Sequence, residues 1–132
     1  RPACEKAGAV LVEAKARSER HVEPENMPAW YQGIDVYVCA SSSEGFSIAL
    51  LEAAACGRVV VSTRVGGSTE LIHHGEDGFL VDRSVEAIAH LLRGLGENRK
   101  QMQEIGEAMR IKVEKLWSWK VRTPAWLSFL KA

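Results

Sequence analysis

Two glutamates, Glu44 and Glu52, have the residue type and the spacing that most clearly suggest chemistry in this sequence. Glu44 lies in a polar run after residues 36–40, and Glu52 is the single charged residue in the apolar run of residues 48–56. Burying an unpaired carboxylate is costly, so Glu52 needs either a narrow line of solvent or a hydrogen-bonding partner. Taken alone, Glu52 is explained as well by a solvated stripe on a helix as by a binding role.

The loop before residue 48 favours the binding role. Gly45, Phe46 and Ser47 bring backbone N–H groups to the expected start of a helix. Unpaired donors and the helix dipole favour an anion such as phosphate at that place. A carboxylate two turns into the helix could then accept hydrogen bonds from ribose hydroxyls. This combination suits a nucleotide, and it is more specific than a glycine-rich loop on its own.

The segments around this loop predict how it is positioned. Residues 36–40 and 59–62 are β-branched and aromatic runs typical of buried strands, and residues 48–56 form a helix that Gly57 ends. A strand, a helix and a second strand make a crossover between parallel strands. Open parallel sheets bind ligands at the carboxyl ends of their strands, which is where Glu44 falls.

The rest of the sequence predicts further elements of an α/β domain. Residues 9–12 and 79–81 are expected strands, although a helix over residues 3–17 competes with the first. Residues 15–25 are expected to form a charged loop. A second glycine-rich loop, with Gly66 and Gly67, precedes a short helix containing Glu70, and it fits a tight turn or a second ligand-facing wall equally well. Helices are expected over residues 2–7, 26–33, 84–95 and 98–116, with a final helix starting at residues 123–124.

Composition and charge exclude several classes of function. The chain has 132 residues, enough for one domain with one core, and we expect residues 1–132 to form a single domain. Its 17 basic and 17 acidic residues cancel, so we expect no general attraction to nucleic acid or anionic lipid. No apolar run reaches membrane-spanning length. The three cysteines favour buried thiols in a reducing, cytoplasmic compartment, and the adjacent His73 and His74 lack further ligands at metal-binding spacing.

A longer series of motifs runs in order through residues 9–120. Its members are Met27-Pro28 with Tyr31, Asp35 to Val38, Ser41, Glu44-Gly45-Phe46, Leu51-Glu52-Ala53, Gly57 to Val61, Gly66-Gly67 with Glu70, and Gly78 to Val81. This series resembles the C-terminal half of the glycosyl transferases group 1 family. The resemblance implies the GT-B fold, here an incomplete Rossmann-like parallel sheet with flanking helices, and a retaining transferase that uses nucleotide-diphosphate sugars.

The resemblance also implies roles for individual residues. Glu44 would approach the donor sugar as the catalytic candidate, and Glu52 would bind the ribose hydroxyls. Enzymes of this kind need no metal or other cofactor. Ser47 stands where the family often has glycine, which narrows the conformations of the loop. The implied donor-binding residues are Glu44, Gly45, Phe46, Ser47, Ile48 and Glu52, with the backbone N–H groups of residues 46–48 holding the sugar edge and the pyrophosphate.

Parts of the family pattern have no match here. The family supplies an Arg and a Lys for the diphosphate from an upstream unit, and it has an N-terminal acceptor-binding domain. We therefore expect a partial donor-binding domain, inactive alone, whose partners are a nucleotide sugar and the missing N-terminal domain. Three of the four tryptophans lie in the last sixteen residues. They fit either core residues or a surface that contacts such a domain. The alternatives are a nucleotide-sugar epimerase of the same fold and a non-catalytic α/β interaction module.

The resemblance finally implies a gap in the sheet. Sheets of this type order their strands 3-2-1-4-5-6, and residues 9–12, 36–39, 59–62 and 79–81 would be strands 3 to 6. With strands 1 and 2 absent, residues 36–39 become an edge with open backbone groups, which is a pairing site. We expect either that residues 9–12 pair directly with residues 36–39, or that two chains form a homodimer through this edge.

Overall fold

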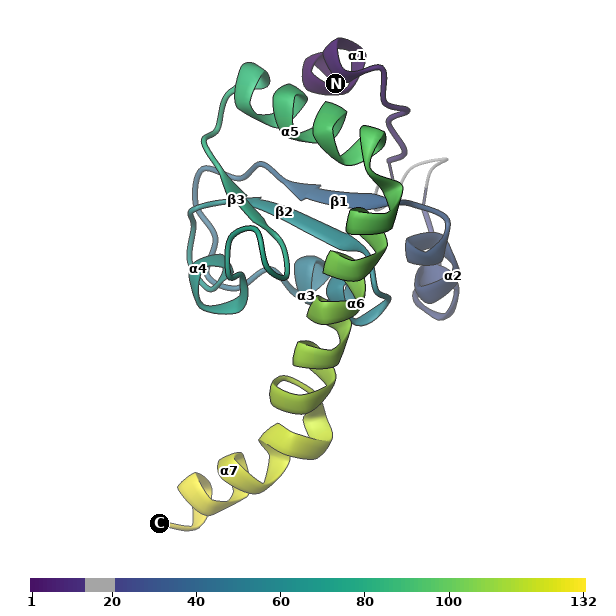
Figure 1. The fold of residues 1–132 in the computed structure, drawn as a ribbon. Coiled ribbons are helices and arrows are strands. Elements are labelled where there is room, and N and C mark those ends of the chain that lie inside the picture. The colour runs from purple at the N-terminus through teal and green to yellow at the C-terminus, as the bar shows by residue number, and fades with distance from the viewer. Residues whose placement is uncertain (14–20) are drawn as a thin grey trace.

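A three-stranded parallel sheet organises the structure, a computed structural model that describes residues 1–13 and 21–132 (Figure 1). Strands β1 (Val36–Cys39), β2 (Val59–Thr63) and β3 (Phe79–Val81) lie in the order β1-β2-β3. Val36 is paired with Val59, and Val61 with Phe79. The predicted α/β class and these three strands are therefore confirmed.

The helices follow the predicted pattern closely. Ser47, Ser84 and Asn98 each cap a helix, because their side-chain oxygens accept from the backbone N–H three residues on, at 3.1–3.3 Å. The final helix starts earlier than predicted, with Pro124 inside it. The helices are α1 (Pro2–Ala7), α2 (Met27–Gln32), α3 (Ile48–Ala55), α4 (Ser68–Leu71), α5 (Val85–Glu97), α6 (Arg99–Leu116) and α7 (Trp119–Lys131), with a 3-10 turn η1 (Pro24–Asn26) before α2.

The core lies on both faces of β2, whose five residues are all buried. On one face Val60 packs with α3 and with the second half of α6, including Met109 and Val113. On the other face Val59 and Val61 pack with α5 and with the start of α6. Helix α6 serves both faces because it passes close to the chain between α3 and β2: a Cβ on Gly106 would lie 2.3 Å from the carbonyl oxygen of Gly57. Strand β2 is therefore the centre of the sheet, and the loop at its carboxyl end contains Gly66 and Gly67.

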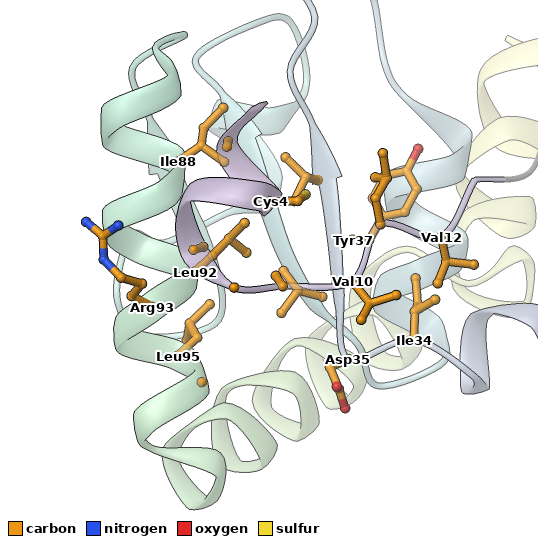
Figure 2. Close-up of a pocket in the computed structure, with 18 of the residues that line it drawn as sticks. Cys4, Val10, Val12, Ile34, Asp35, Tyr37, Ile88, Leu92, Arg93 and Leu95 are labelled. Carbon is orange, nitrogen blue, oxygen red and sulfur yellow. The ribbon is translucent and has the colours of Figure 1, made fainter. Parts of the chain in front are cut away.

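The predicted strand over residues 9–12 is wrong. These residues form no strand and are exposed, with 88% of Val10 accessible to solvent. Gly8, with φ of 67°, turns the chain directly after α1, and the Ala9 N–H bonds back to Cys4 O. The run then lies across β1 without pairing to it, and Val10 and Val12 lie beside Ile34 and Tyr37 (Figure 2). Direct pairing with β1 is thus also wrong, because a run of apolar residues makes a strand only when its backbone aligns with a neighbour.

The competing helix over residues 3–17 is not formed in the part that can be seen, because α1 ends at Ala7 and residues 8–13 are not helical. Residues 14–17 of that helix lie outside the described residues. So do residues 15–20 of the predicted charged loop.

The free edge of β1 opens into a cleft of about 950 Å³ (Figure 2). Among the described residues, β1 pairs with β2 alone. The cleft is lined by α1, by residues 8–12, by β1 and by one side of α5. The open edge that the truncated strand order implied is therefore present.

Helix α7 leaves the body of the structure, and all of its residues are exposed (Figure 1). Trp119 is 78% and Trp126 56% exposed, and Phe129 and Leu130 are more than 70% exposed. These two tryptophans are therefore surface residues, whereas Trp117 is half-buried. Within the described residues, no helix combines the length and the apolar character that crossing a membrane would need.

Candidate functional site

Two loops meet at the carboxyl ends of neighbouring strands. The loop after β1 carries Glu44, and the loop after β2 carries Gly66 and Gly67. The Gly67 N–H donates to the carbonyl of Gly45 at 2.7 Å, and the Thr63 hydroxyl donates to the carbonyl of Ser41 at 2.6 Å. The parallel sheet therefore brings the two glycine-containing loops together at one edge, although they are about twenty residues apart in sequence.

The two loops approach each other too closely for side chains. A Cβ on Gly66 would lie 2.0 Å from the Gly45 carbonyl oxygen and 2.1 Å from that of Glu44. A Cβ on Gly67 would lie 1.9 Å from the ring of Phe46. Gly66 also has a φ of 43°, which side chains disfavour. The second loop therefore supports the backbone of the first.

Glu44, in the loop after β1, is half-buried. Its Oε1 accepts from the hydroxyl of Ser41 at 2.9 Å, and that hydroxyl accepts in turn from the Cys39 thiol at 3.6 Å. One carboxylate oxygen is thus held by its own loop. The arrangement gives Glu44 a defined direction at the end of β1.

The sequence left open whether Glu52 faces solvent or has a hydrogen-bonding partner, and in the structure it does both. It is exposed on α3, and its Oε2 accepts from the hydroxyl of Tyr31 at 3.0 Å. Its neighbours Leu50, Ala53 and Ala54 point inward and are buried. Glu52 is therefore a solvent-facing carboxylate with one buried partner.

The start of α3 presents unpaired donors. Among the residues that the structure describes, no protein acceptor is bonded to the backbone N–H groups of Phe46, Ser47 and Ile48. The Ser47 hydroxyl instead accepts from Leu50 N, which satisfies the next turn of the helix. Three adjacent N–H groups at a helix N-terminus form an arrangement that binds anions.

Comparison with known families gives this arrangement a context. The model of the glycosyl transferases group 1 family matches residues 2–112, most of the chain. The chain belongs to this family. The motifs of the two loops and of α3 lie within the matched residues.

Curated relatives in the family are longer than this chain. A D-inositol 3-phosphate glycosyltransferase of Pseudarthrobacter chlorophenolicus is 52% identical over 56 residues, which are 42% of this chain and 13% of the relative. A protein of the same name from Arthrobacter sp. is 40% identical over 92 residues, which are 67% of this chain and 22% of the relative. The chain thus spans less than a quarter of the length of these relatives.

Solved structures in the comparison share the fold. Sucrose-phosphate synthase from Thermosynechococcus elongatus superposes with a TM-score of 0.81 at 24% identity, over 84% of this chain and 28% of the other. The C-terminal domain of a group 1 glycosyl transferase (LpcC) from Francisella tularensis gives 0.69 at 32% identity, over 74% and 51%. Anabaena Alr3699/HepE in complex with UDP gives 0.72 at 22% identity, over 81% and 30%. The predicted C-terminal half of a GT-B fold is therefore confirmed as the architecture.

The pKa of Tyr37 reflects the charges of both glutamates. Burial raises the pKa of the Tyr37 hydroxyl and the negative groups of Cys39, Glu44 and Glu52 raise it further, whereas a hydrogen bond with Ser47 lowers it. Its ring lies edge-on to Tyr31, with the centroids 6.0 Å apart. Both carboxylates therefore act on the same tyrosine, although they belong to a loop and to a helix.

Phe46, the aromatic residue of the loop after β1, contacts a residue near the C-terminal end of α6. Phe46 packs against Trp117, which follows α6, with 4.9 Å between the ring centroids. The guanidinium of Arg122 in α7 lies 4.5 Å from the centre of Trp117. The loop is thus held by Gly67 on one side and by Trp117 on the other.

Sequence reasoning missed several residues at this site. Tyr31 was named in the motif series of the sequence, but no partner was predicted for its hydroxyl; the available signal was that a buried tyrosine normally bonds its hydroxyl to a partner. Arg83 was not singled out, yet its Nε donates to the carbonyl of Ala40 at 2.9 Å, at the start of the loop after β1. His74 Nδ1 accepts from Leu80 N, and no group of three possible metal ligands occurs within the described residues.

Proposed function

We propose that residues 1–132 are a partial nucleotide-sugar-binding domain of a group 1 glycosyltransferase that transfers a sugar to an acceptor with retention. The observation that carries this proposal is that one loop and the helix following it carry Glu44, the unpaired N–H groups of residues 46–48 and, one turn further along α3, Glu52. Carboxylates accept from sugar hydroxyls and helix N-termini bind phosphate. A nucleotide-diphosphate sugar presents both kinds of group.

In this proposal each group has one task. Glu44 faces the hydroxyls of the transferred sugar and is the catalytic candidate. Glu52 accepts from the ribose, and the N–H groups of Phe46, Ser47 and Ile48 hold the sugar edge and the pyrophosphate. Gly45 joins its loop to the loop after β2 by accepting from Gly67. The complex of HepE with UDP, on a similar fold, makes uridine diphosphate the first ligand to test.

The isolated chain binds a donor in this proposal but does not transfer sugar. It spans 13% and 22% of two curated relatives, and the Arg and Lys that the family resemblance implies at the diphosphate have no counterpart in the motifs of residues 1–132. Oriented charges at a transition state are each worth about a hundredfold or more in rate. In this proposal the exposed apolar residues of α7 form the surface that the acceptor-binding domain of a longer enzyme covers. Donor-dependent glycosylation by the isolated chain would contradict this part of the proposal.

Two further parts of the proposal concern the chain itself. Its three cysteines are free thiols, which supports a reducing, cytoplasmic compartment. The open edge of β1 supports a homodimer of the isolated chain through that edge.

The central test is a ¹H–¹⁵N NMR titration of the labelled chain with UDP, GDP and ADP. We expect one diphosphate to shift the resonances of residues 44–48 and 52 at micromolar to millimolar concentration. Glu52→Gln should weaken that binding, whereas Glu104→Gln, on the exposed side of α6, should leave it unchanged. Shifts confined to residues outside the two loops and α3, or none with any diphosphate, would overturn the proposal.

A further inference from the structure

The hydroxyl of Tyr31 is a buried group that the proposed donor site does not yet use. It donates to Glu52 Oε2 at 3.0 Å, from α2 to α3, across 21 positions of sequence. Tyr31 is 2% exposed, whereas Glu52 is exposed. The contact therefore joins the core to a carboxylate on the surface.

The ring of Tyr31 has little freedom to leave this contact. Trp30 packs edge-on to it with centroids 5.2 Å apart, and Tyr37 packs edge-on at 6.0 Å. Tyr31 also belongs to the core cluster of Val60, Leu50 and Ala53. Because the ring is fixed, the hydroxyl presents its proton in one direction.

The effect on Glu52 follows from the chemistry of the carboxylate. A glutamate on an exposed helix face samples several rotamers, and a ligand that needs one of them must immobilise the side chain. A hydrogen bond to Oε2 selects one rotamer in advance and leaves Oε1 and the second lone pair of Oε2 for other donors. Burial and the neighbouring Glu52 both raise the pKa of Tyr31, so its hydroxyl stays a donor.

We propose that Tyr31 is a positioning residue for the nucleotide: it holds Glu52 in the rotamer that accepts the ribose hydroxyls, and so contributes to the preference for a ribose over a sugar without those hydroxyls. This inference rests on the proposed function. Losing the pre-organisation of one flexible side chain should weaken binding about 3- to 10-fold. The loss should be confined to ligands that carry the ribose hydroxyls.

The test compares UDP, GDP and ADP with their 2′,3′-dideoxy forms in NMR titrations of the labelled chain. For the diphosphate that binds most tightly, we expect the ribose form to bind more tightly than the dideoxy form. Tyr31→Phe should reduce this ratio about 3- to 10-fold and leave the affinity for the dideoxy form unchanged. Glu52→Gln should reduce the ratio at least as far, and the double variant should equal Glu52→Gln.

A matched control separates positioning from general loss of stability. Ser84→Ala removes the cap of α5, whose bond from Ala87 N is 3.1 Å, and it touches neither loop of the site. It should leave the ratio at its starting value. A second measurement needs no variant: the ring resonances of Tyr31 in tyrosine-labelled protein should shift with the ribose form and not with the dideoxy form.

The outcomes distinguish this inference from the function on which it rests. If Glu52→Gln removes the ratio and Tyr31→Phe does not, the inference is wrong and the ribose role of Glu52 stands. Equal weakening of both ligands by Tyr31→Phe would also overturn the inference, because it would indicate a structural role. If no diphosphate binds, or if the unchanged chain shows no preference for the ribose form, the ribose assignment itself fails and this inference fails with it.

Discussion

Substituting Gly66 with alanine tests whether the contact between the two loops shapes the site. A Cβ at this position would lie 2.0 Å from the Gly45 carbonyl oxygen, about 1 Å closer than the 3.0 Å that such contacts require. The obstacle is backbone, so a change of rotamer cannot relieve it. The Gly45 carbonyl also accepts from Gly67 N at 2.7 Å, so moving it strains or breaks that bond.

The magnitude follows from comparison with Gly75. Both glycines have positive φ, 43° for Gly66 and 84° for Gly75, so alanine costs backbone strain of about 1–2 kcal/mol at either one. A Cβ on Gly75 meets nothing within 4 Å. Gly66→Ala should therefore lower the free energy of unfolding by about 1–3 kcal/mol more than Gly75→Ala, which is the usual cost of overpacking.

The assay is urea denaturation followed by tryptophan fluorescence, with the same NMR titration as a second reading. An extra 1–3 kcal/mol corresponds to a denaturation midpoint lower by about 1 M, at a typical dependence of about 1–3 kcal/mol per M. Gly66→Ala should also weaken diphosphate binding, because Glu44 and residues 45–47 move with the loop, whereas Gly75→Ala should not. Equal effects of the two substitutions on stability and on binding would refute the proposed support of one loop by the other.

Other predictions address the rest of the structure. Lys112→Met should destabilise the fold by about 3–5 kcal/mol, since Asp77, 9% exposed and 2.7 Å from Lys112 Nζ, would lose its lysine partner and keep only its contacts with His73. Lys100→Met in an exposed pair should cost under about 1 kcal/mol. Similar costs of the two substitutions in urea denaturation would contradict this difference. Val10→Lys should reduce self-association of the chain in light scattering, and a chain that is monomeric at high concentration would argue against pairing through β1. In the full-length enzyme that we propose, Glu52→Ala should weaken donor binding by about 1.5–3 kcal/mol, and Glu44→Ala should lower turnover more than donor affinity. Steady-state kinetics with an unchanged KM for the donor in Glu52→Ala would exclude its ribose role.

The elements that could be predicted are those whose local sequence pattern agrees with their burial in the folded structure. Residues 36–39 and 59–63 are β-branched and aromatic, and they are flanked by elements that cover both faces of β2. Helix starts can be predicted at Ser47, Ser84 and Asn98, because the side chain of each accepts from the backbone N–H three residues on. The meeting of the two glycine-rich loops also follows from sequence, since parallel strands bring their carboxyl ends to one edge.

Two predictions were wrong for different physical reasons. Residues 9–12 have the apolar character of a strand, but pairing depends on where the backbone lies relative to β1, and Gly8 directs it across that strand instead. The start of α7 was placed at Pro124 because proline favours the first turn of a helix. In the structure Pro124 lies inside α7, where it leaves the Lys120 carbonyl without its helical donor. That carbonyl is on a helix whose residues are all exposed, so water can satisfy it.

The environment of Glu52 shows which features of the site could be predicted from the sequence and which could not. An isolated carboxylate among Ile, Ala, Leu and Cys predicts a need for solvent or a partner, and both are present. The identity of the partner depends on how α2 packs against α3, which no spacing in the chain encodes. A tyrosine inside an apolar cluster nevertheless carries a hydroxyl that burial obliges to find an acceptor. The sequence therefore predicts that the acid and the phenol each need a partner, and the packing of α2 against α3 makes them partners of each other.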